Sequence, residues 1–299
     1  MKPVLYMAVG LPSSGKSYCA KKYFSNINIH SSDDIRVELF GNVDVQDKND
    51  KVFNLLHKRV KEDLKSGRNS FIDATNITSK RRRAFLKDIR NIDCTKVCLV
   101  FATTVERCKS SNKLREKSVP ESVIDRMYRN FEMPGMFEGW DKIFVIYNEE
   151  DNYDSYDFCK VLAEADKFDQ KNPHHTHTLG EHLRRVRSQL LDCGDKNLAT
   201  AGFLHDIGKM KTQTFLDASG NPSDIAHYYS HHNVGAYDSM IIVRGYSDDD
   251  IVDICTLVQW HMNPYFWEFE STRAKYKDIW GEELYNRIML LHEADKNAK

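Results

Sequence analysis

The chain has 299 residues and a formal net charge of −1 at pH 7, with 41% hydrophobic and 29% charged residues. These values are typical of a soluble globular protein with room for two domains, and they exclude a bulk basic field for nucleic acid, though not a local basic surface. No stretch approaches the roughly 20 apolar residues of a membrane span, and seven scattered cysteines without a C-x-x-C pair predict reduced thiols in a cytoplasmic protein. Because the N-terminus enters a strand pattern directly, we expect no secretion signal.

The first predicted element is a short buried strand over residues 4–9, which a turn and a helical stretch follow. The spacing Gly10-x-x-x-x-Gly15-Lys16-Ser17 fits the phosphate-binding loop in full, and an accidental Gly/Ser-rich turn would not need this context. Glycines let successive backbone N–H groups face a phosphate, and the helix adds its positive N-terminal end. Lys16 supplies a charge for the outer phosphates of ATP, and Ser17 supplies a hydroxyl for Mg²⁺. The predicted nucleotide-binding residues are Gly10, Leu11, Pro12, Ser13, Ser14, Gly15, Lys16 and Ser17.

Two adjacent carboxylates follow the second predicted strand, which covers residues 26–29. Asp33 and Asp34 stand just past this strand with Arg36 close behind, where parallel α/β sheets place their active sites. Asp33 is therefore a candidate catalytic residue. Ser and Asp also favour helix N-caps, and the two roles are compatible.

The chain continues with a predicted helix over residues 47–66 and a strand from residue 70 that ends in Asp73. Asp73 is a candidate for the Mg²⁺ site or for holding an arginine. The basic run 80–83 begins the next helix and is either a solvated face or a contact for a phosphate backbone.

Two further buried strands are predicted over residues 96–103 and 142–147. The segment between them is cationic, and it either closes over the triphosphate to stabilise charge on the transferring group or forms an ordinary solvated helix. Its cationic residues are Arg107, Lys109, Lys113, Arg115 and Lys117.

Five segments of this half occur in a recognisable order. They are Gly10 to Ser17, Asp33-Asp34-Ile35-Arg36, Asp73-Ala74-Thr75-Asn76, Arg115 before Val119-Pro120, and Phe131-x-x-Pro134. Together they resemble the kinase module of polynucleotide kinases, especially the phage and bacterial end-healing enzymes. The resemblance implies an α/β P-loop kinase domain over residues 1–150, with a parallel sheet, helices on both faces, and ATP and Mg²⁺ as cofactors.

The same resemblance implies roles for three side chains. Asp33 would act as the general base on a 5′-hydroxyl, Arg36 would hold the neighbouring phosphate of the acceptor, and Arg115 would clamp the donor phosphates. The lid of the family often carries two arginines one helical turn apart, whereas this chain has Ser111 one turn before Arg115. Related P-loop kinases also include enzymes for small molecules.

The middle of the chain separates two domains of different composition. Residues 148–157 are acidic and polar without an apolar period, which predicts a loop, and a short helix is predicted over residues 158–165. We therefore assign residues 1–150 to the first domain, 151–165 to a linker, and 166–299 to the second domain.

Histidines concentrate in the second half, where ten of the twelve lie beyond residue 170. Several of them, together with two aspartates, stand at the ends of apolar helical stretches, which is costly for buried polar groups unless something binds them. Imidazoles and carboxylates that converge from several helices favour a divalent transition metal, and Mn, Fe, Co, Ni and Zn all fit. A lone histidine on an apolar helix is more often a satisfied core residue, so the inference depends on the set. The set is His174, His175, His177, His182, His205, Asp206, His231, His232, His261, His292 and Asp295.

The order of these residues resembles the HD phosphohydrolase superfamily, and LATAGFLHDIGKMKT and SHHNVGA are the most specific stretches. The resemblance covers about residues 170–299 and implies an all-α fold. The family ligands carried onto this chain are His182, His205, Asp206 and Asp295. His231 and His261 match positions that bind a second metal in binuclear members, and His232 and His292 are weaker candidates.

In such a site an activated water attacks phosphorus, and Lys209 could hold a non-bridging oxygen. Glu181 or Asp238 could orient the ligands from outside. The aromatic segment 263–269 follows His261 directly and is either a stacking surface for a base or part of the core.

Two sites on one chain predict a substrate that needs both. The leading interpretation is RNA end repair, in which the second half removes a 2′,3′-cyclic or 2′/3′-phosphate and the first half phosphorylates a 5′-hydroxyl. Nucleic-acid ends, RNA rather than DNA, and a separate ligase are then the expected partners. The alternatives are a small-molecule or nucleoside kinase fused to a nucleotide phosphohydrolase, a nucleotide-sensing regulatory protein, and a scaffold with decayed sites. The intact Lys16, Ser17, His205 and Asp206 argue against decay.

Overall fold

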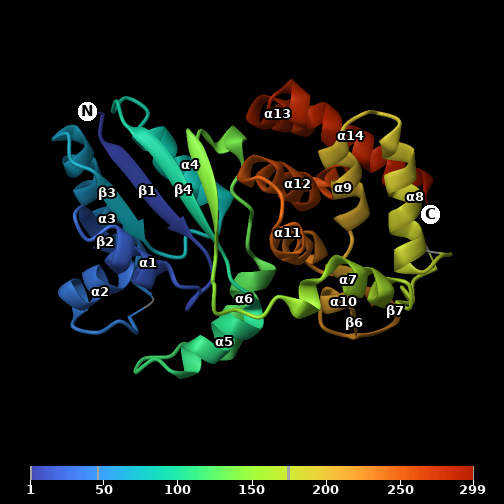
Figure 1. Cartoon of the computed structure of the whole chain (residues 1–299), viewed down its shortest axis with the longest axis horizontal. Helices are drawn as coiled ribbons and strands as arrows, with labels where there is room; N and C mark the ends of the chain where they lie inside the picture. The colour runs from blue at the N-terminus through green and yellow to red at the C-terminus, as the bar shows by residue number, and fades with distance from the viewer. Residues whose placement is uncertain (1, 46, 174–175, 299) are drawn as a thin grey trace. The chain divides into compact units, whose positions relative to one another are not determined.

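The computed structural model describes residues 2–45, 47–173 and 176–298, so His174 and His175 lie outside the described residues. The chain divides into two compact units (Figure 1). Residues 1–124 and 138–151 form the first unit, and residues 125–137 and 152–299 form the second. Most of the segment predicted as a linker thus belongs to the second unit, and it contains α7 (Phe158–Ala165) where the sequence predicts a short helix.

The first unit, within the described residues, is built on five parallel strands in the order β2-β3-β1-β4-β5. Both faces of the sheet are covered, because β3 and residues 97–102 of β4 are buried without alternation. The strand order reverses next to β1, so the turn after β1 lies at the edge where open α/β sheets bind ligands. The strands are β1 (Val4–Val9), β2 (Asn28–Ser31), β3 (Ser70–Asp73), β4 (Thr95–Ala102) and β5 (Lys142–Tyr147).

The helices of the first unit connect these strands. α3 buries Val52, Leu56 and Val60 at intervals of four residues, which gives it one apolar face, and Gly67 follows its end with φ 75°. The predicted second strand is displaced by two residues, because the polar His30 and Ser31 still pair with β3 before the next helix begins. The helices are α1 (Lys16–Tyr23), α2 (Ser32–Phe40), α3 (Asn49–Lys65), α4 (Ser79–Asp88) and α5 (Val105–Lys113). The boundary between the two units falls within α6 (Glu121–Arg129) and within the 3₁₀ turn η1 (Met136–Glu138), so each belongs partly to both.

One arginine of the basic run 80–83 is a core residue, so neither interpretation of that run holds for it. The side chains of Arg82 and Glu138 are 0% exposed, and two guanidinium nitrogens donate to the carboxylate at 2.6 and 2.8 Å. Arg82 also donates to the carbonyl of Asn76, and the Trp140 indole donates to Glu138. A fully buried charge needs such partners, and the carboxylate lies 56 residues further along the chain, where a local pattern cannot reveal it.

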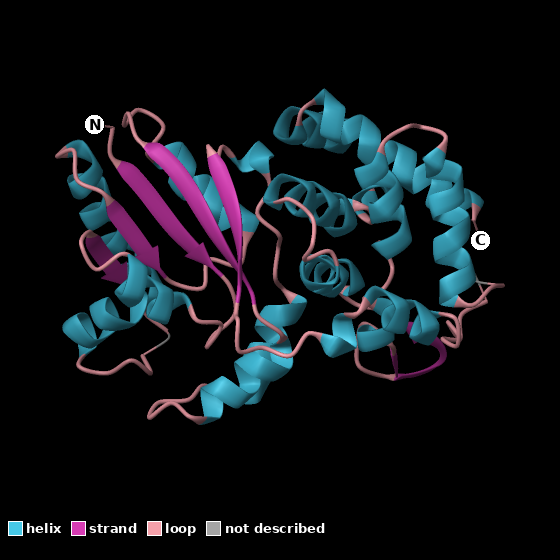
Figure 2. Ribbon diagram, viewed as in Figure 1, coloured by secondary structure: helices cyan, strands magenta, loops and turns pink. Residues whose placement is uncertain are grey.

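The second unit is a helical bundle with a two-stranded hairpin that the helical pattern does not predict (Figure 2). α8 and α9 approach closely at Gly202, where a Cβ would come within 2.6 Å of Leu190. No helix of the described chain is both long and apolar enough to cross a membrane. The elements are the 3₁₀ turn η2 (Asp154–Tyr156), α7 (Phe158–Ala165), α8 (Leu179–Leu191), α9 (Lys196–Leu204), α10 (Lys209–Thr212), β6 (Thr214–Leu216), β7 (Pro222–His227), α11 (His231–Ile242), α12 (Asp248–Trp260), η3 (Asn263–Phe266), α13 (Glu270–Trp280) and α14 (Glu282–Asn297).

Residues 125–137 belong to the second unit because their side chains pack there. Tyr128 and Phe131 both lie edge-on to Tyr237 of α11, with ring centroids 5.3 and 4.8 Å apart. The Tyr128 hydroxyl donates to the buried carboxylate of Asp238 at 2.6 Å. These contacts connect segments more than 100 residues apart in the chain.

Candidate functional site

The turn between β1 and α1 has the conformation of a phosphate-binding loop. Ser13 and Gly15 adopt positive φ values of 61° and 98°, which turn successive N–H groups to one side. Gly10 is required for space, because a Cβ there would lie 2.8 Å from the Ser14 hydroxyl and 3.0 Å from Cβ of Phe101. Residues 10–15 therefore form a loop that leads directly into α1, whose first two residues are Lys16 and Ser17.

Lys16 points into this loop, and only 7% of it is exposed. Its Nζ donates to the carbonyl of Leu11 at 2.5 Å and to the Ser14 hydroxyl at 3.3 Å, and burial lowers its pKa. The Ser17 hydroxyl donates to Asp73 at the end of β3, and burial raises the pKa of that carboxyl. A hydroxyl and a carboxylate side by side next to the loop are suited to Mg²⁺ on a bound nucleotide.

Asp33 lies at the start of α2, beside the same edge of the sheet. The Ser31 hydroxyl caps this helix by accepting from the backbone N–H of Asp34 at 3.2 Å, and Asp33 occupies the first turn. Ser31 pairs with Asp73 in the sheet, which brings α2 next to the Mg²⁺ candidate. The Asp33 side chain is 55% exposed, so an acceptor hydroxyl can reach it.

Two arginines flank Asp33. Arg36 donates to Asp33 Oδ1 at 2.8 Å and to Asn49 at 2.8 Å, and its side chain is 5% exposed. In the structure Arg36 therefore holds Asp33 in place, and its contacts are not with an open acceptor site. Arg115 lies 4.0 Å from Asp33 Oδ2 with its side chain 44% exposed. Its guanidinium is therefore accessible from solvent beside Asp33.

In the second unit, helix ends carry the predicted metal ligands to one place. One histidine lies in the first turn of α8, one begins α11, and two follow the last residues of α9 and α12. An aspartate comes from the last turn of α14, and another follows the α9 histidine. The ligand atoms form two buried groups, each within 4.8 Å, and the groups share Asp206. The first group is His182, His205, Asp206 and Asp295. The second group is Asp206, His231 and His261.

The hydrogen bonds of the four histidines fix which nitrogen faces the cluster. Nδ1 of His205, His231 and His261 lies 2.8, 2.7 and 2.7 Å from the carbonyl oxygen three residues earlier, and Nδ1 of His182 lies 3.4 Å from the Ala298 carbonyl. Since a carbonyl only accepts, each Nδ1 carries the proton, which leaves the Nε2 lone pair for the cluster. Three of these carbonyls lie at the C-terminal ends of α9, α12 and α14, and that of Tyr228 lies ahead of α11.

Asp206 connects the two groups through its two oxygens. Oδ2 lies 3.4 Å from Nε2 of His205 and 3.6 Å from that of His182. Oδ1 lies 3.2 and 3.6 Å from Nε2 of His231 and His261, and among the described residues neither of these two buried nitrogens makes a hydrogen bond. One carboxylate that faces two sets of imidazoles is the arrangement of a bridging ligand.

Asp295 completes the first group and is itself held from outside. Its Oδ1 lies 3.2 Å from Nε2 of His182, and its Oδ2 accepts from the Tyr265 hydroxyl at 2.8 Å. The Tyr265 ring lies edge-on to His292, with ring centroids 4.4 Å apart. His292, a weaker candidate for a metal ligand, therefore packs behind the ligand set. Tyr265 is a positioning residue whose role the aromatic character of segment 263–269 does not reveal.

The electrostatics of the cluster call for positive charge. Burial lowers the pKa of His205, but Asp206 and Asp295 outweigh this effect and raise its pKa to about 10. The cationic and imidazole partners of Asp206 and Asp295 hold the pKa of both carboxyls below its usual range despite their burial. A divalent cation supplies the same charge to neutral imidazoles, so the donor set, with its orphaned nitrogens, fits a metal.

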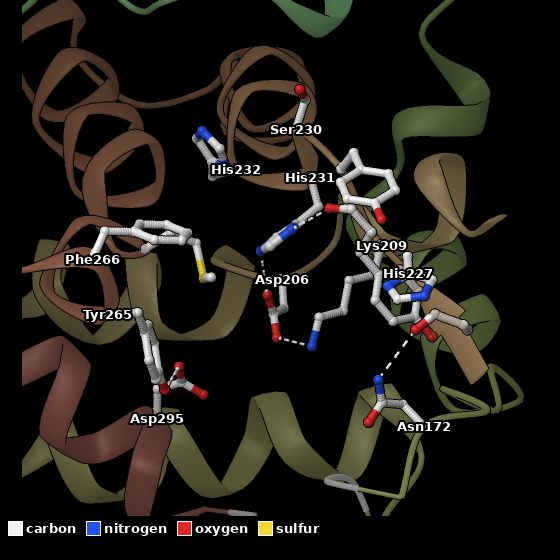
Figure 3. Close-up of a pocket in the computed structure, with 14 residues that line it drawn as sticks. Asn172, Asp206, Lys209, His227, Ser230, His231, His232, Tyr265, Phe266 and Asp295 are labelled. Carbon is white, nitrogen blue, oxygen red and sulfur yellow. Dashed lines mark hydrogen bonds and ion pairs between the residues drawn. The ribbon is translucent and has the colours of Figure 1, made fainter. Parts of the chain in front are cut away.

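Lys209 and a cavity of about 410 Å³ lie beside the cluster (Figure 3). Lys209 Nζ lies 2.6 Å from Asp206 Oδ2 and donates to Gln170 at 3.0 Å, so its charge meets the cavity next to Asp206. His232 lines the cavity beside His231, and burial lowers its pKa to about 3. A phosphoryl group in this cavity would meet Lys209 and the cluster together.

The outer partners of the histidines are backbone carbonyls, not the two acidic residues considered from the sequence. Glu181 accepts from Arg185 at 2.8 Å, and Asp238 accepts from Tyr128 and lies 3.0 Å from Lys211 Nζ. The sequence does not show that backbone carbonyls are the hydrogen-bond partners of the histidine Nδ1 atoms. The one signal is that three of the histidines stand at helix ends, where backbone carbonyls lack helical partners.

The fold and these sites define two classes of domain. Residues 5–134 match the family model described as an AAA domain, and residues 174–298 match the one described as an HD domain. The chain is therefore a P-loop kinase-like domain followed by an HD domain, and the predicted fold class is confirmed. The first class implies ATP and Mg²⁺ and the second implies divalent metals, and both indicate an enzyme.

Among curated proteins, the chain is similar to L-seryl-tRNA(Sec) kinase of Methanococcus maripaludis, with 25% identity over 167 residues. The match covers 54% of this chain and 64% of the relative, which is less than two thirds of its length. Among solved structures, it is similar to a chain of the Pnkp1/Rnl/Hen1 RNA repair complex (22% identity, TM-score 0.36, 43% of each chain). It is also similar to Chaetomium thermophilum Kti12 in complex with ADP-AlF3 (18% identity, TM-score 0.39, 50% of this chain and 91% of that chain).

Proposed function

We propose that the protein processes nucleic-acid ends with two activities. The first unit phosphorylates a 5′-hydroxyl from ATP, and the second hydrolyses a 2′,3′-cyclic or terminal 2′/3′-phosphate with one or two divalent metals. The observation that carries the proposal is the presence, on one chain, of a phosphate loop with an exposed carboxylate beside it and a buried cluster of four imidazoles and two carboxylates. RNA is the preferred polymer, because cleaved RNA carries both kinds of end.

In the kinase half, Asp33 takes the proton of the acceptor hydroxyl, and Arg36 orients its carboxylate. Lys16, Arg115 and the loop amides stabilise the charge that spreads over the transferring phosphoryl group. Ser17 would hold Mg²⁺ with Asp73 near it. The test is transfer of ³²P from γ-labelled ATP to RNA and DNA oligonucleotides with 5′-hydroxyl ends. Labelling should be lost in Asp33→Asn and retained in His205→Ala, and no labelling of any oligonucleotide would remove this half of the proposal.

In the hydrolase half, His182, His205, Asp206 and Asp295 would hold one metal, with His231 and His261 available for a second. When bound, the metal supplies Lewis acidity and an activated water for attack on phosphorus. Lys209 holds a non-bridging oxygen of the phosphate. The test is phosphate release or ring opening on RNA ends with Mn²⁺, Ni²⁺, Co²⁺, Fe²⁺ or Zn²⁺. Activity should be lost in His205→Ala and retained in Asp33→Asn.

A second acceptor class follows from the curated relative, whose name describes a kinase of L-seryl-tRNA(Sec). The exposed Asp33 carboxylate does not by itself select a 5′-end over another hydroxyl. Seryl-tRNA, 5′-hydroxyl oligonucleotides and free nucleosides should therefore be compared as acceptors at equal concentration. If seryl-tRNA or nucleosides are phosphorylated in preference to oligonucleotides, the acceptor is that hydroxyl and not the 5′-hydroxyl end of a nucleic acid. A separate ligase would then have no product to seal.

A further inference from the structure

The connection between α5 and α6 carries Arg115 and has little packing of its own. Residues 113–118 are all exposed, and Figure 1 shows this segment projecting beyond the end of α5. Lys113 pairs with Glu121 at 2.9 Å, but both side chains are exposed, and pairs of this kind contribute little to stability. The place of Arg115 beside Asp33 therefore depends on a support from outside the segment.

That support is one buried amide. Asn112 lies in the last turn of α5 and is 2% exposed. Its Nδ2 donates to the carbonyl of Val119 at 2.7 Å, and its Oδ1 accepts from the backbone N–H of the same residue at 3.0 Å. The side chain thus pairs with both polar groups of Val119, as a neighbouring strand would, and fixes where the segment ends.

The backbone of Asn112 holds the segment at a second point. Its carbonyl accepts from the backbone N–H of Arg115 at 3.2 Å. Asn112 therefore binds Arg115 through its main chain and Val119 through its side chain, and only residues 116–118 lie between these two attachments. The guanidinium that lies 4.0 Å from Asp33 Oδ2 extends from a segment that one residue anchors twice.

The residue type suits this task. Val119 offers one donor and one acceptor, and a carboxamide of this length matches both. A carboxylate at position 112 could accept from the N–H of Val119, but its second oxygen would face the carbonyl with no proton to share. An alanine would leave both groups of Val119 to water, which can reach this half-buried residue.

We infer that Asn112 is a positioning residue that holds Arg115 for phosphoryl transfer. The inference rests on the proposed kinase function and extends it to a neutral residue that orders one of its charged groups. A cation fixed in advance stabilises the charge that develops on the transferring group without reorganisation during the reaction. Loss of the anchor should therefore act on the chemical step.

The first test is a double-mutant cycle on the transfer of ³²P from γ-labelled ATP to a 5′-hydroxyl oligonucleotide. Asn112→Ala should lower kcat by roughly 10- to 100-fold with little change in the KM for ATP, because it misplaces a group that acts in the transition state. In an Arg115→Ala background the same substitution should cost no more than about twofold, since the positioned side chain is gone. An equal fall in both backgrounds overturns the inference.

Two further variants separate the anchor from general effects on α5. Ser110→Ala is the matched control, because Ser110 lies on the same helix and its exposed hydroxyl donates to the carbonyl of Arg107 within that helix. It should keep the wild-type kcat. Asn112→Asp keeps the size of the side chain and should be as slow as Asn112→Ala. A wild-type kcat in Asn112→Asp would show that the pairing with Val119 does not matter.

The second test needs no acceptor. ADP and Mg²⁺ with aluminium fluoride, which mimics the transferring phosphoryl group, should bind to the wild type more tightly than ADP and Mg²⁺ alone in isothermal titration calorimetry. Asn112→Ala should reduce this gain by roughly tenfold, and only when Arg115 is present. A gain that Asn112→Ala leaves unchanged overturns the inference. The same coupling, without phosphorylation of any oligonucleotide, seryl-tRNA or nucleoside by the wild type, keeps the inference and removes the proposed kinase function.

Discussion

Nε2 of His182 and Nε2 of His205 lie 3.2 Å apart in the second unit. Both rings have Nδ1 beside a backbone carbonyl, so both present a lone pair to the same space. Two lone pairs at this distance repel unless a proton or a cation lies between them. Without a metal, the proton that His205 retains through its raised pKa fills this role, and a divalent cation supplies the same positive charge to neutral imidazoles.

Removal of metal should therefore destabilise the second unit. We expect EDTA to lower its thermal unfolding midpoint by several degrees, since a ligand at 100 times its Kd contributes about 2.7 kcal/mol. Differential scanning calorimetry with chelator and with metal added back measures this shift. His205→Ala should show no response to EDTA, and an equal response in that variant would contradict the assignment of the ligands.

Asp33→Asn should lower the rate of phosphoryl transfer by about 100- to 10,000-fold, because it removes the proton acceptor for the hydroxyl. Asp34→Asn is the matched control, since this neighbour contributes its backbone N–H to the Ser31 cap and that N–H is unchanged. Initial rates at saturating ATP separate the two variants. Equal losses in both would show that the charge of the first turn of α2, and not one carboxylate, is what matters.

Gly208→Ala should impair hydrolysis while the kinase stays active. A Cβ at Gly208 would lie 2.1 Å from the His231 carbonyl and 2.7 Å from the Gly235 backbone nitrogen, so α11 would have to move. A displacement of about 1 Å in a catalytic group can lower a rate by about a hundredfold. Gly245→Ala, where a Cβ would meet nothing within 4 Å, is the control. Parallel kinase and phosphatase assays on each variant provide the measurement.

Arg82→Met should lower the free energy of unfolding by about 3–5 kcal/mol, because it leaves the Glu138 carboxylate buried without its partner. The double variant Arg82→Met/Glu138→Leu should recover much of that loss. Urea denaturation followed by tryptophan fluorescence, to which Trp140 of this region contributes, measures the free energy of unfolding. A double variant as unstable as the single one would mean that the carbonyl of Asn76 and the indole, and not the ion pair, dominate the energetics.

The first unit should lose stability as the pH falls from about 6.5 to about 4. His57 stacks on Phe85 with ring centroids 4.3 Å apart, and burial, aided by the charge of Lys61, lowers its pKa from 6.5 to about 4. The unfolded chain binds this proton at a higher pH than the folded chain, so the contribution is complete above 6.5 and is lost below it. His57→Phe should flatten this part of the curve of unfolding free energy against pH. An unchanged slope would assign the acid sensitivity to other groups.

The sequence predicts local features of this molecule well and distant partners poorly. The loop spacing at residues 10–17 and the periodicity of α3 are carried by neighbouring residues, and the structure reproduces both. The six metal-ligand candidates converge because each stands at or near a helix end, and for His205, Asp206, His261 and Asp295 the apolar run before them already indicates this. The Arg82–Glu138 pair and the packing of Tyr128 on Tyr237 depend on contacts made across the fold, so the sequence does not reveal them.

The packing of Tyr128 and Phe131 on Tyr237 decides how the gene can be divided. A single cut near residue 150 would leave Tyr128 and Phe131 on the N-terminal fragment without their packing partner. The C-terminal fragment would have an unfilled space in its core beside Tyr237. Independent expression of either half would therefore need residues 125–137 to be transplanted, by circular permutation or co-expression, to the fragment whose core they fill.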